Sequence, residues 1–103
     1  MIELQPYAQT GDTVLIAATT VSGQATMPFA VAGASTSLRV YNDGPSLAFV
    51  TIGKTTATAS VNSIPIPSGG TQLINKGPND TVAAVTLTTT ANVYFTPGYG
   101  ITT

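Results

Sequence analysis

The chain has 103 residues, of which 43% are hydrophobic and only 7% are charged, and its formal net charge is −1. This length and apolar content suffice for one domain with a core, and they exclude intrinsic disorder. Three Lys and Arg residues are too few for a surface that follows nucleic-acid phosphates. No apolar run approaches the roughly 20 residues of a membrane helix.

Composition also predicts the class of secondary structure. The sequence has 19 threonines and nine valines, and Glu3 is its only glutamate, so strand formers far outnumber helix formers. With so few charges, edge strands have little to prevent pairing with other chains. Two interpretations stay open: neighbouring subunits cover the surface, or Thr, Ser, Asn and Gln keep it hydrated.

Residues 1–12 are expected to form an N-terminal arm in front of a β-domain at 13–103. Ile2, Leu4 and Tyr7 alternate with polar residues, so the arm should pack on something, either its own sheet or a neighbouring subunit. The first ten residues lack the basic and apolar regions of a signal peptide. We therefore expect synthesis in a cytoplasm without export.

Short stretches of alternating apolar and polar residues, separated by Gly, Pro, Asn and Asp, follow along the chain. About eight such strands without a helical stretch predict an all-β fold, a single antiparallel β-sandwich or jelly roll, with a small barrel as the alternative. The predicted strands are 13–19, 25–31, 38–41, 47–53, a weak one at 54–61, 71–75, 81–87 and 91–96.

The segment 37–53, SLRVYNDGPSLAFVTIG, is predicted to be the central hairpin of the sheet. Leu38 and Val40 alternate with Arg39 and Tyr41 before the turn residues NDGPS, and a second alternating run follows. Glycine and proline favour a tight turn there, and Asn or Asp can bond back to the backbone.

The segment Ile64-Pro65-Ile66-Pro67 cannot be a central strand, because two prolines lack the N–H that a ladder needs. It should be extended and stiff. Either it is a crossover loop whose isoleucines cap the core, or it is a rigid apolar projection that inserts into a partner. Pro97-Gly98 should end the last strand.

The sequence offers little for catalysis. It has no His and no Cys, which excludes Ser-His-Asp and Cys-His schemes. Asp12, Asp43 and Asp80 each lie at a predicted turn, where local hydrogen bonding explains them, and a metal site in a loop is the weaker alternative. Gly53-Lys54-Thr55 matches the end of a phosphate-binding loop, but Ala48 replaces its first glycine. We expect no enzyme activity, catalytic residue, cofactor or metal.

The aromatic residues do not cluster with basic residues along the chain, so most should lie in the core or on sheet faces. A carbohydrate-binding surface built from Tyr41, Tyr94 and Tyr99 is the alternative that stays open.

Three stretches, LRVYNDGPSLAFVTIG, SIPIPSGGTQLI and TVAAVTLTTTANVYFTPGYG, carry a resemblance to a known group of proteins. They contain a V-x-N-x-G segment, an F-V-x-x-G strand, a P-I-P-x-G loop and an alanine-rich strand that ends in V-Y-x-T-P-G. In these motifs, over residues 37–100, the chain resembles small structural proteins of tailed bacteriophages. The resemblance implies a virion component, a β-sandwich that decorates or cements a capsid shell, and it carries no active-site residues with it.

Two functional hypotheses follow. The first is a decoration protein on the capsid surface, expected to be a homotrimer, whose partners are the major capsid protein and copies of itself, with neither nucleic acid nor membrane. The second is a host- or glycan-binding module of a head or tail fibre, and a head–tail connector or tail component is a variant of the first. The candidate partner-contact residues are Ile2, Leu4, Tyr7, Ile64, Ile66 and Tyr99.

Overall fold

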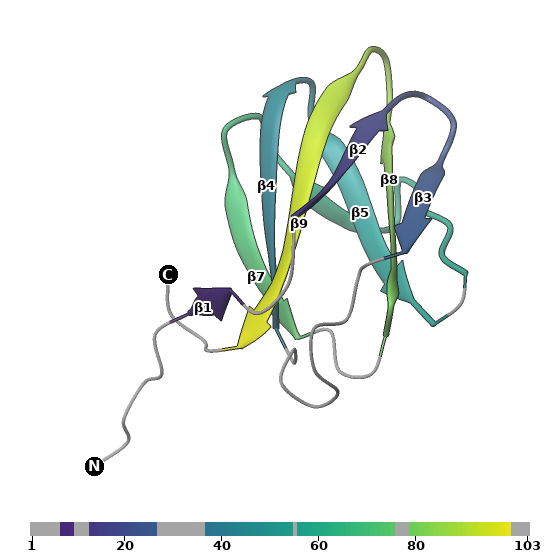
Figure 1. The fold of residues 1–103 in the computed structure, drawn as a ribbon. Helices are drawn as coiled ribbons and strands as arrows, with labels where there is room; N and C mark the ends of the chain where they lie inside the picture. Colours follow the sequence, from purple (N-terminus) through teal and green to yellow (C-terminus); the bar gives the residue numbers. More distant parts are fainter. Residues whose placement is uncertain (1–6, 10–12, 27–36, 55, 76–78, 100–103) are drawn as a thin grey trace.

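A computed structural model describes residues 7–9, 13–26, 37–54, 56–75 and 79–99. They form two antiparallel sheets that face each other, so the predicted all-β fold is confirmed and the arrangement is that of a β-sandwich (Figure 1). The strands are β1 (Ala8–Gln9), β2 (Val14–Ala18), β3 (Gly23–Thr26), β4 (Ser37–Pro45), β5 (Ala48–Gly53), β6 (Ile64–Ile66), β7 (Thr71–Asn75), β8 (Thr81–Thr86) and β9 (Ala91–Tyr99). The described ranges contain no helix that could cross a membrane.

One sheet has five strands and the other has four. In the five-stranded sheet the order is β1-β9-β4-β7, and β2 pairs with β9 on the same side as β1. In the four-stranded sheet the order is β3-β8-β5-β6. The proline-containing β6 thus lies at an edge, as its missing N–H requires.

The core lies between the two sheets and comes from alternate residues of each strand. Leu38 and Val40 of β4 and Val93 and Phe95 of β9 are fully buried. They meet the inner face of the four-stranded sheet, where Val82 is also fully buried. The alternation that the sequence shows in residues 38–41 therefore separates core from surface as predicted.

The four-stranded sheet is buried on its outer face as well. Phe49, Ala83 and Val85 form a second apolar cluster there, and Ala59 packs on it. Residues 56–60, in the region of the predicted weak strand, contain no strand, so this prediction is wrong. The segment instead covers the cluster as a loop.

Two hydrogen bonds explain why residues 56–60 leave the sheet. The backbone N–H of Ala57 donates to Gln24 Oε1 at 2.9 Å, and that of Ala59 donates to Ser22 Oγ at 2.9 Å. Side chains of the β2–β3 region thus satisfy backbone donors that a ladder would otherwise take. The small side chains in this stretch permit the close approach.

The predicted central hairpin at 37–53 is also wrong in one respect. β4 and β5 form as expected, but they belong to different sheets: β4 pairs with β7 and β9, and β5 pairs with β6 and β8. The residues between them form an arch from one sheet to the other. The buried side chain of Asn42 explains this arch. Its amide nitrogen donates to the backbone oxygen of Ser46, within the arch, and to that of Ile66, in the other sheet.

The last strand extends further than predicted. β9 passes through Pro97 and Gly98 to Tyr99 instead of ending at Thr96. Gly98 has register partners on both sides, Gln9 in β1 and Ser37 in β4. The sequence gives little sign of β1, whose pairing supports this extension. Of the strand predicted at 25–31, the structure places residues 25 and 26 in edge strand β3, which begins earlier, at Gly23, and residues 27–31 lie outside the described ranges.

Three connections lie at one end of the sandwich: β2–β3, β4–β5 and β8–β9 (top in Figure 1). Hydrogen bonds join them: the N–H of Ser46 donates to Thr90 O at 3.3 Å, and the N–H of Thr86 donates to Thr19 O at 2.8 Å. Each loop exposes one large apolar side chain. These are Val21, Leu47 and Leu87, which are 74%, 41% and 58% exposed. We call these three loops the loop end.

Candidate functional site

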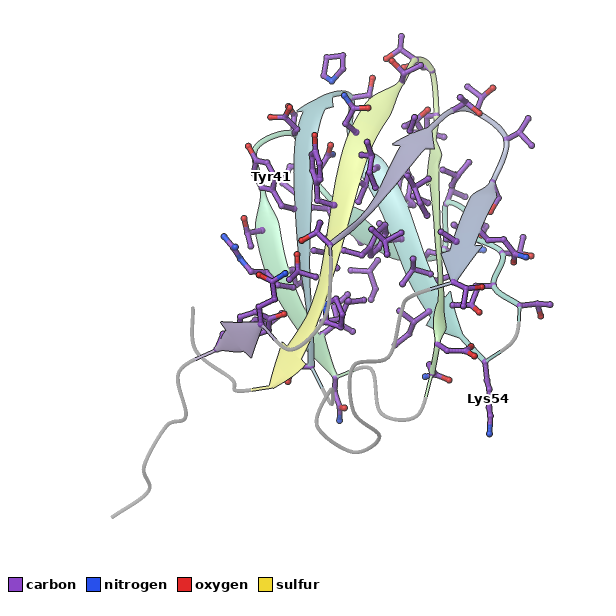
Figure 2. All side chains as sticks on the ribbon, viewed as in Figure 1. Tyr41 and Lys54 are labelled. Carbon is purple, nitrogen blue, oxygen red and sulfur yellow. The ribbon has the colours of Figure 1, made fainter. Side chains whose placement is uncertain are left out.

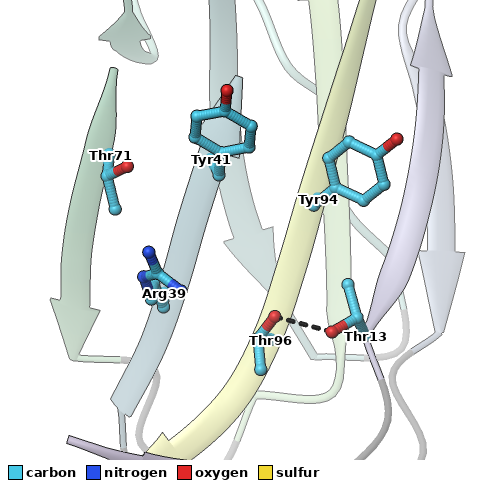
Figure 3. Close-up of a pocket in the computed structure, with 6 residues that line it drawn as sticks. All are labelled: Thr13, Arg39, Tyr41, Thr71, Tyr94 and Thr96. Atoms are coloured by element: carbon cyan, nitrogen blue, oxygen red, sulfur yellow. Dashed lines mark hydrogen bonds between the residues drawn. The ribbon is translucent and has the colours of Figure 1, made fainter. Parts of the chain in front are cut away.

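Two tyrosines lie side by side on the outer face of the five-stranded sheet. Tyr41 of β4 and Tyr94 of β9 are direct register partners, and their ring centroids are 6.2 Å apart with an angle of 27° between the ring planes. Figure 3 shows the two rings as neighbours on adjacent strands. They face away from the core because Val40 and Phe95, next to them in sequence, point inward.

A pocket of about 320 Å³ opens beside the two rings. Its other walls come from four strands or strand ends of the same sheet, and they are polar. Thr13 and Thr96 share a hydrogen bond of 2.8 Å at one side of it (Figure 3). Arg39 and Thr71 complete the lining. We call this pocket, with the two tyrosine rings, the tyrosine face.

One hydrogen bond orients the hydroxyl group of Tyr41. Tyr41 Oη donates to Asp43 Oδ1 at 3.2 Å. This bond and the negative charge of Asp43 raise the pKa of Tyr41, because ionisation of the phenol would break the bond and place a second negative charge beside the carboxylate. Asp43 therefore accepts a hydrogen bond from Tyr41, in addition to the turn position that the sequence predicts for it.

The tyrosine face can bind but has few means to catalyse a reaction. It offers two aromatic rings, a guanidinium group, one carboxylate and several hydroxyls. Within the described parts of the chain, no group of three or more His, Cys, Asp or Glu side chains could hold a metal ion. Asp80 accepts a hydrogen bond from Thr81 Oγ1 at 3.0 Å, a local contact of the kind predicted for a turn. Asp12 lies outside the described residues.

Lys54 lies far from the tyrosine face, at the other end of the molecule (Figure 2). It follows the end of β5, and residues 56–60 form a loop instead of the helix that a phosphate-binding loop requires. A Cβ atom at Gly53 would overlap the carbonyl oxygen of Thr56. Gly53 is thus explained by the close approach of the covering loop.

The candidate contact residues of the N-terminal arm divide into two groups. Ile2 and Leu4 lie outside the described residues. Tyr7 is half-buried, its hydroxyl donates to Thr96 O, and burial raises the pKa of its phenol. β1, which follows it directly, pairs with β9. The described end of the arm therefore packs on its own sheet, one of the two arrangements expected.

The isoleucines of the IPIP segment face inward. Ile66 is 1% exposed and belongs to the core, and Ile64 is half-buried against it. Ile66 is therefore unavailable to a partner in this fold, which corrects its choice as a contact residue and favours the interpretation as core-capping residues. The backbone of Tyr99 pairs with that of Ala8, and the structure does not describe the side chain of Tyr99.

The structure brings together Tyr41 and Tyr94, which the sequence suggested as part of a carbohydrate surface. Sequence reasoning missed four other residues that line the same pocket, Thr13, Arg39, Thr71 and Thr96. Arg39 and Thr96 had a usable signal, because each lies two residues from Tyr41 or Tyr94 in the same strand and therefore on the same face. The other two come from strands whose neighbours the sequence does not specify.

We compared the chain with protein-family models, with curated proteins and with solved structures, and none of them matches it.

Proposed function

We propose that this chain is a structural protein of a bacteriophage particle, a decoration protein that binds the outside of the head and stabilises it through protein–protein contacts. It would act as a homotrimer that bridges copies of the major capsid protein, without catalysis, cofactor, metal, nucleic acid or membrane. The motifs between residues 37 and 100 support this proposal, as does the β-sandwich that they build.

The observation that carries the proposal is the near absence of charge on the surface. The described residues include only four charged side chains, those of Arg39, Asp43, Lys54 and Asp80. A monomer in solution usually has about a quarter of its surface residues charged. Contacts between subunits require little desolvation of ions when both surfaces are uncharged. This surface is therefore suited to permanent contact with neighbours.

The loop end is the surface that we assign to the capsid. Its exposed side chains Val21, Leu47 and Leu87 are apolar, and the loops around them are rich in threonine and serine. The backbone hydrogen bonds between the loops restrain the loops that carry these side chains, which reduces the entropy lost on binding. Ile66 of β6 is buried and cannot take this role.

A binding experiment with empty heads tests the proposal. Purified protein should co-sediment with heads assembled from the major capsid protein of the same phage. Size-exclusion chromatography with light scattering should give the mass of a trimer. The double variant Val21→Ser/Leu87→Ser should bind at least about tenfold more weakly, because it removes apolar area from the contact. Leu15→Ser, at an exposed side chain next to Tyr94 on the five-stranded sheet, is the control and should bind normally. A monomer that never associates with heads, even at high concentration, would overturn the proposal.

A second candidate function, a host- or glycan-binding module, is favoured by a different observation. The sequence alone offered three tyrosines for a carbohydrate surface, and the structure pairs two of them, Tyr41 and Tyr94, beside a polar pocket. A module of this kind could be attached to a head or a tail.

A further inference from the structure

We propose that the tyrosine face is a carbohydrate-binding site, in which a pyranose ring lies across Tyr41 and Tyr94 while Arg39 donates to its hydroxyl or carboxylate groups and Asp43 accepts from its hydroxyl groups. This inference is independent of the capsid proposal, because it concerns a sheet face and not the loop end. A particle protein could have both surfaces.

The spacing of the two rings suits a sugar. Their centroids are 6.2 Å apart and their planes differ by 27°, so the two rings are close neighbours of similar orientation on one sheet face (Figure 3). This separation is close to the length of one sugar unit in an oligosaccharide. The C–H groups on one side of a pyranose ring carry partial positive charge and pack favourably on the negative face of an aromatic ring. Leu15, which is 50% exposed, is the register partner of Tyr94 and extends the apolar surface.

The polar groups around the rings complement sugar hydroxyls. The Arg39 guanidinium provides several N–H donors in a fixed plane, and the Asp43 carboxylate provides acceptors next to Tyr41. Threonine side chains also line the pocket, and two of them, Thr71 and Thr96, lie opposite Tyr41 and Arg39 on the neighbouring strands. Each sugar hydroxyl both donates and accepts, so it can bond to either kind of group. This face therefore offers a ligand an aromatic surface bordered by donors and acceptors.

Other ligand classes fit less well. A nucleic-acid strand also stacks on tyrosines, but it needs several cations along its phosphates, and Arg39 is the only cation lining this pocket. A lipid chain would need an apolar groove, whereas four of the six lining side chains are threonines or arginine. The pocket volume of about 320 Å³ lies at the lower end of the range for small-ligand sites. It is suited to one or two sugar units of a longer chain.

The site is organised before any ligand arrives. Both tyrosines project from long central strands, and residues 37–42 of β4 pair with β9 without a break before the register shifts between Asn42 and Pro45. The bond from Tyr41 to Asp43 and the bond between Thr13 and Thr96 fix further side chains. Binding to such a rigid surface requires little ordering of the protein, so a weak individual contact can still produce measurable affinity.

The test is a titration of the full chain with oligosaccharides, in which amide chemical shifts and calorimetry measure binding. The probes are cellohexaose and maltohexaose as neutral chains and hexagalacturonate as an acidic chain, with a glycan array as the broader screen. We expect at least one probe or array glycan to bind with shifts centred on residues 39–43 and 92–96. If Arg39 binds a carboxylate, the acidic chain should bind more tightly, and Arg39→Gln should remove that preference while retaining the binding of neutral chains.

Variants locate the binding site. Tyr41→Ala and Tyr94→Ala should each weaken binding of the best glycan by about tenfold or more, since each removes half of the aromatic surface. Tyr41→Phe keeps the ring and should bind within about threefold of the unchanged chain. Leu87→Ala, at an exposed apolar residue of the loop end, is the control and should have no effect. Circular dichroism confirms that each variant is folded.

Two results would overturn the inference. The first is that the folded protein binds none of the three probes and no glycan on the array. The second is binding that the two tyrosine-to-alanine variants leave unchanged, which would place the ligand elsewhere. Neither result depends on whether the chain binds phage heads.

Discussion

The side chain of Asn42, in the five-stranded sheet, donates a hydrogen bond of 2.8 Å to the backbone oxygen of Ile66, in the four-stranded sheet. A second bond from the same amide nitrogen, also 2.8 Å, goes to Ser46 O, and the amide oxygen accepts from the N–H of Gly44 at 2.8 Å. Asn42 is fully buried. One amide group thus holds the arch between β4 and β5 and joins the two sheets.

The first prediction concerns this amide. Asn42→Asp keeps the size of the side chain but removes both donated hydrogen bonds and introduces a buried acid. Asn42→Ala leaves the same backbone groups without partners. Each unpaired buried group costs about 1–3 kcal/mol, so both variants should lower the free energy of unfolding by at least about 2 kcal/mol in urea titrations. Asn92→Asp, at an exposed position of β9, is the control. A loss below about 1 kcal/mol for Asn42→Ala would show that the amide does not hold the arch.

The second prediction compares two glycines. Gly44 has a φ of +87°, and a Cβ added there would overlap Ser68 Oγ, whereas Gly69 has a φ of +80° with nothing near the added atom. Gly69→Ala should therefore cost only the left-handed backbone penalty of about 1–2 kcal/mol. Gly44→Ala should cost clearly more. Thermal unfolding of the two variants measures the difference, and equal melting temperatures would contradict the arrangement of the arch over the β6–β7 turn.

Asn42 also shows where sequence reasoning reached its limit. Alternation of apolar and polar residues predicted β4, β5, β7, β8 and most of β9, because that pattern is local. The residues NDGPS indicated a turn, but a turn that joins two strands of one sheet and an arch that joins two sheets have the same composition. Which one forms depends on a hydrogen bond to Ile66, 24 residues further along the chain.

The third prediction concerns the outer cluster of the four-stranded sheet. Phe49 is 8% exposed and packs with Ala83, Val85 and the covering loop. Phe49→Ala should lower the free energy of unfolding by about 3 kcal/mol, at the lower end for buried phenylalanines. Leu87→Ala, at a side chain that is 58% exposed, should change it by less than about 0.5 kcal/mol. Similar values for the two variants in urea unfolding would show that the loop does not bury this face.

The fourth prediction is a pH dependence that originates from Tyr7. Burial raises the pKa of Tyr7 above its usual value of 10.0 in the folded chain, where its hydroxyl donates to Thr96 O. The stabilising contribution of the neutral phenol is complete below pH 10.0 and is lost as the pH rises through the raised pKa, because the unfolded chain releases the proton first. Urea unfolding between pH 8 and pH 11 should therefore show a steeper loss of stability for the unchanged chain than for Tyr7→Phe. Other groups titrate equally in both proteins. Parallel curves would mean that Tyr7 is not held against β9.

The tyrosine face could be predicted only in part. The sequence places Arg39 and Tyr41 on one face of a strand, and a similar alternation places Tyr94 on a face opposite to its neighbours. It does not specify that β4 and β9 are adjacent, nor the register that makes Tyr41 and Tyr94 direct partners. Strand order in a sheet depends on contacts between distant segments. The pairing of the two rings is therefore a property of the fold that no local pattern indicates.

The most direct test of the proposed function is an electron cryomicroscopy map of the phage particle that contains this protein. We predict a β-sandwich on the outside of the head, in copies related by threefold symmetry, with the loops that carry Val21, Leu47 and Leu87 against the shell. A map in which the sandwich is found only in the tail, or in which the purified particle lacks it, would contradict the account.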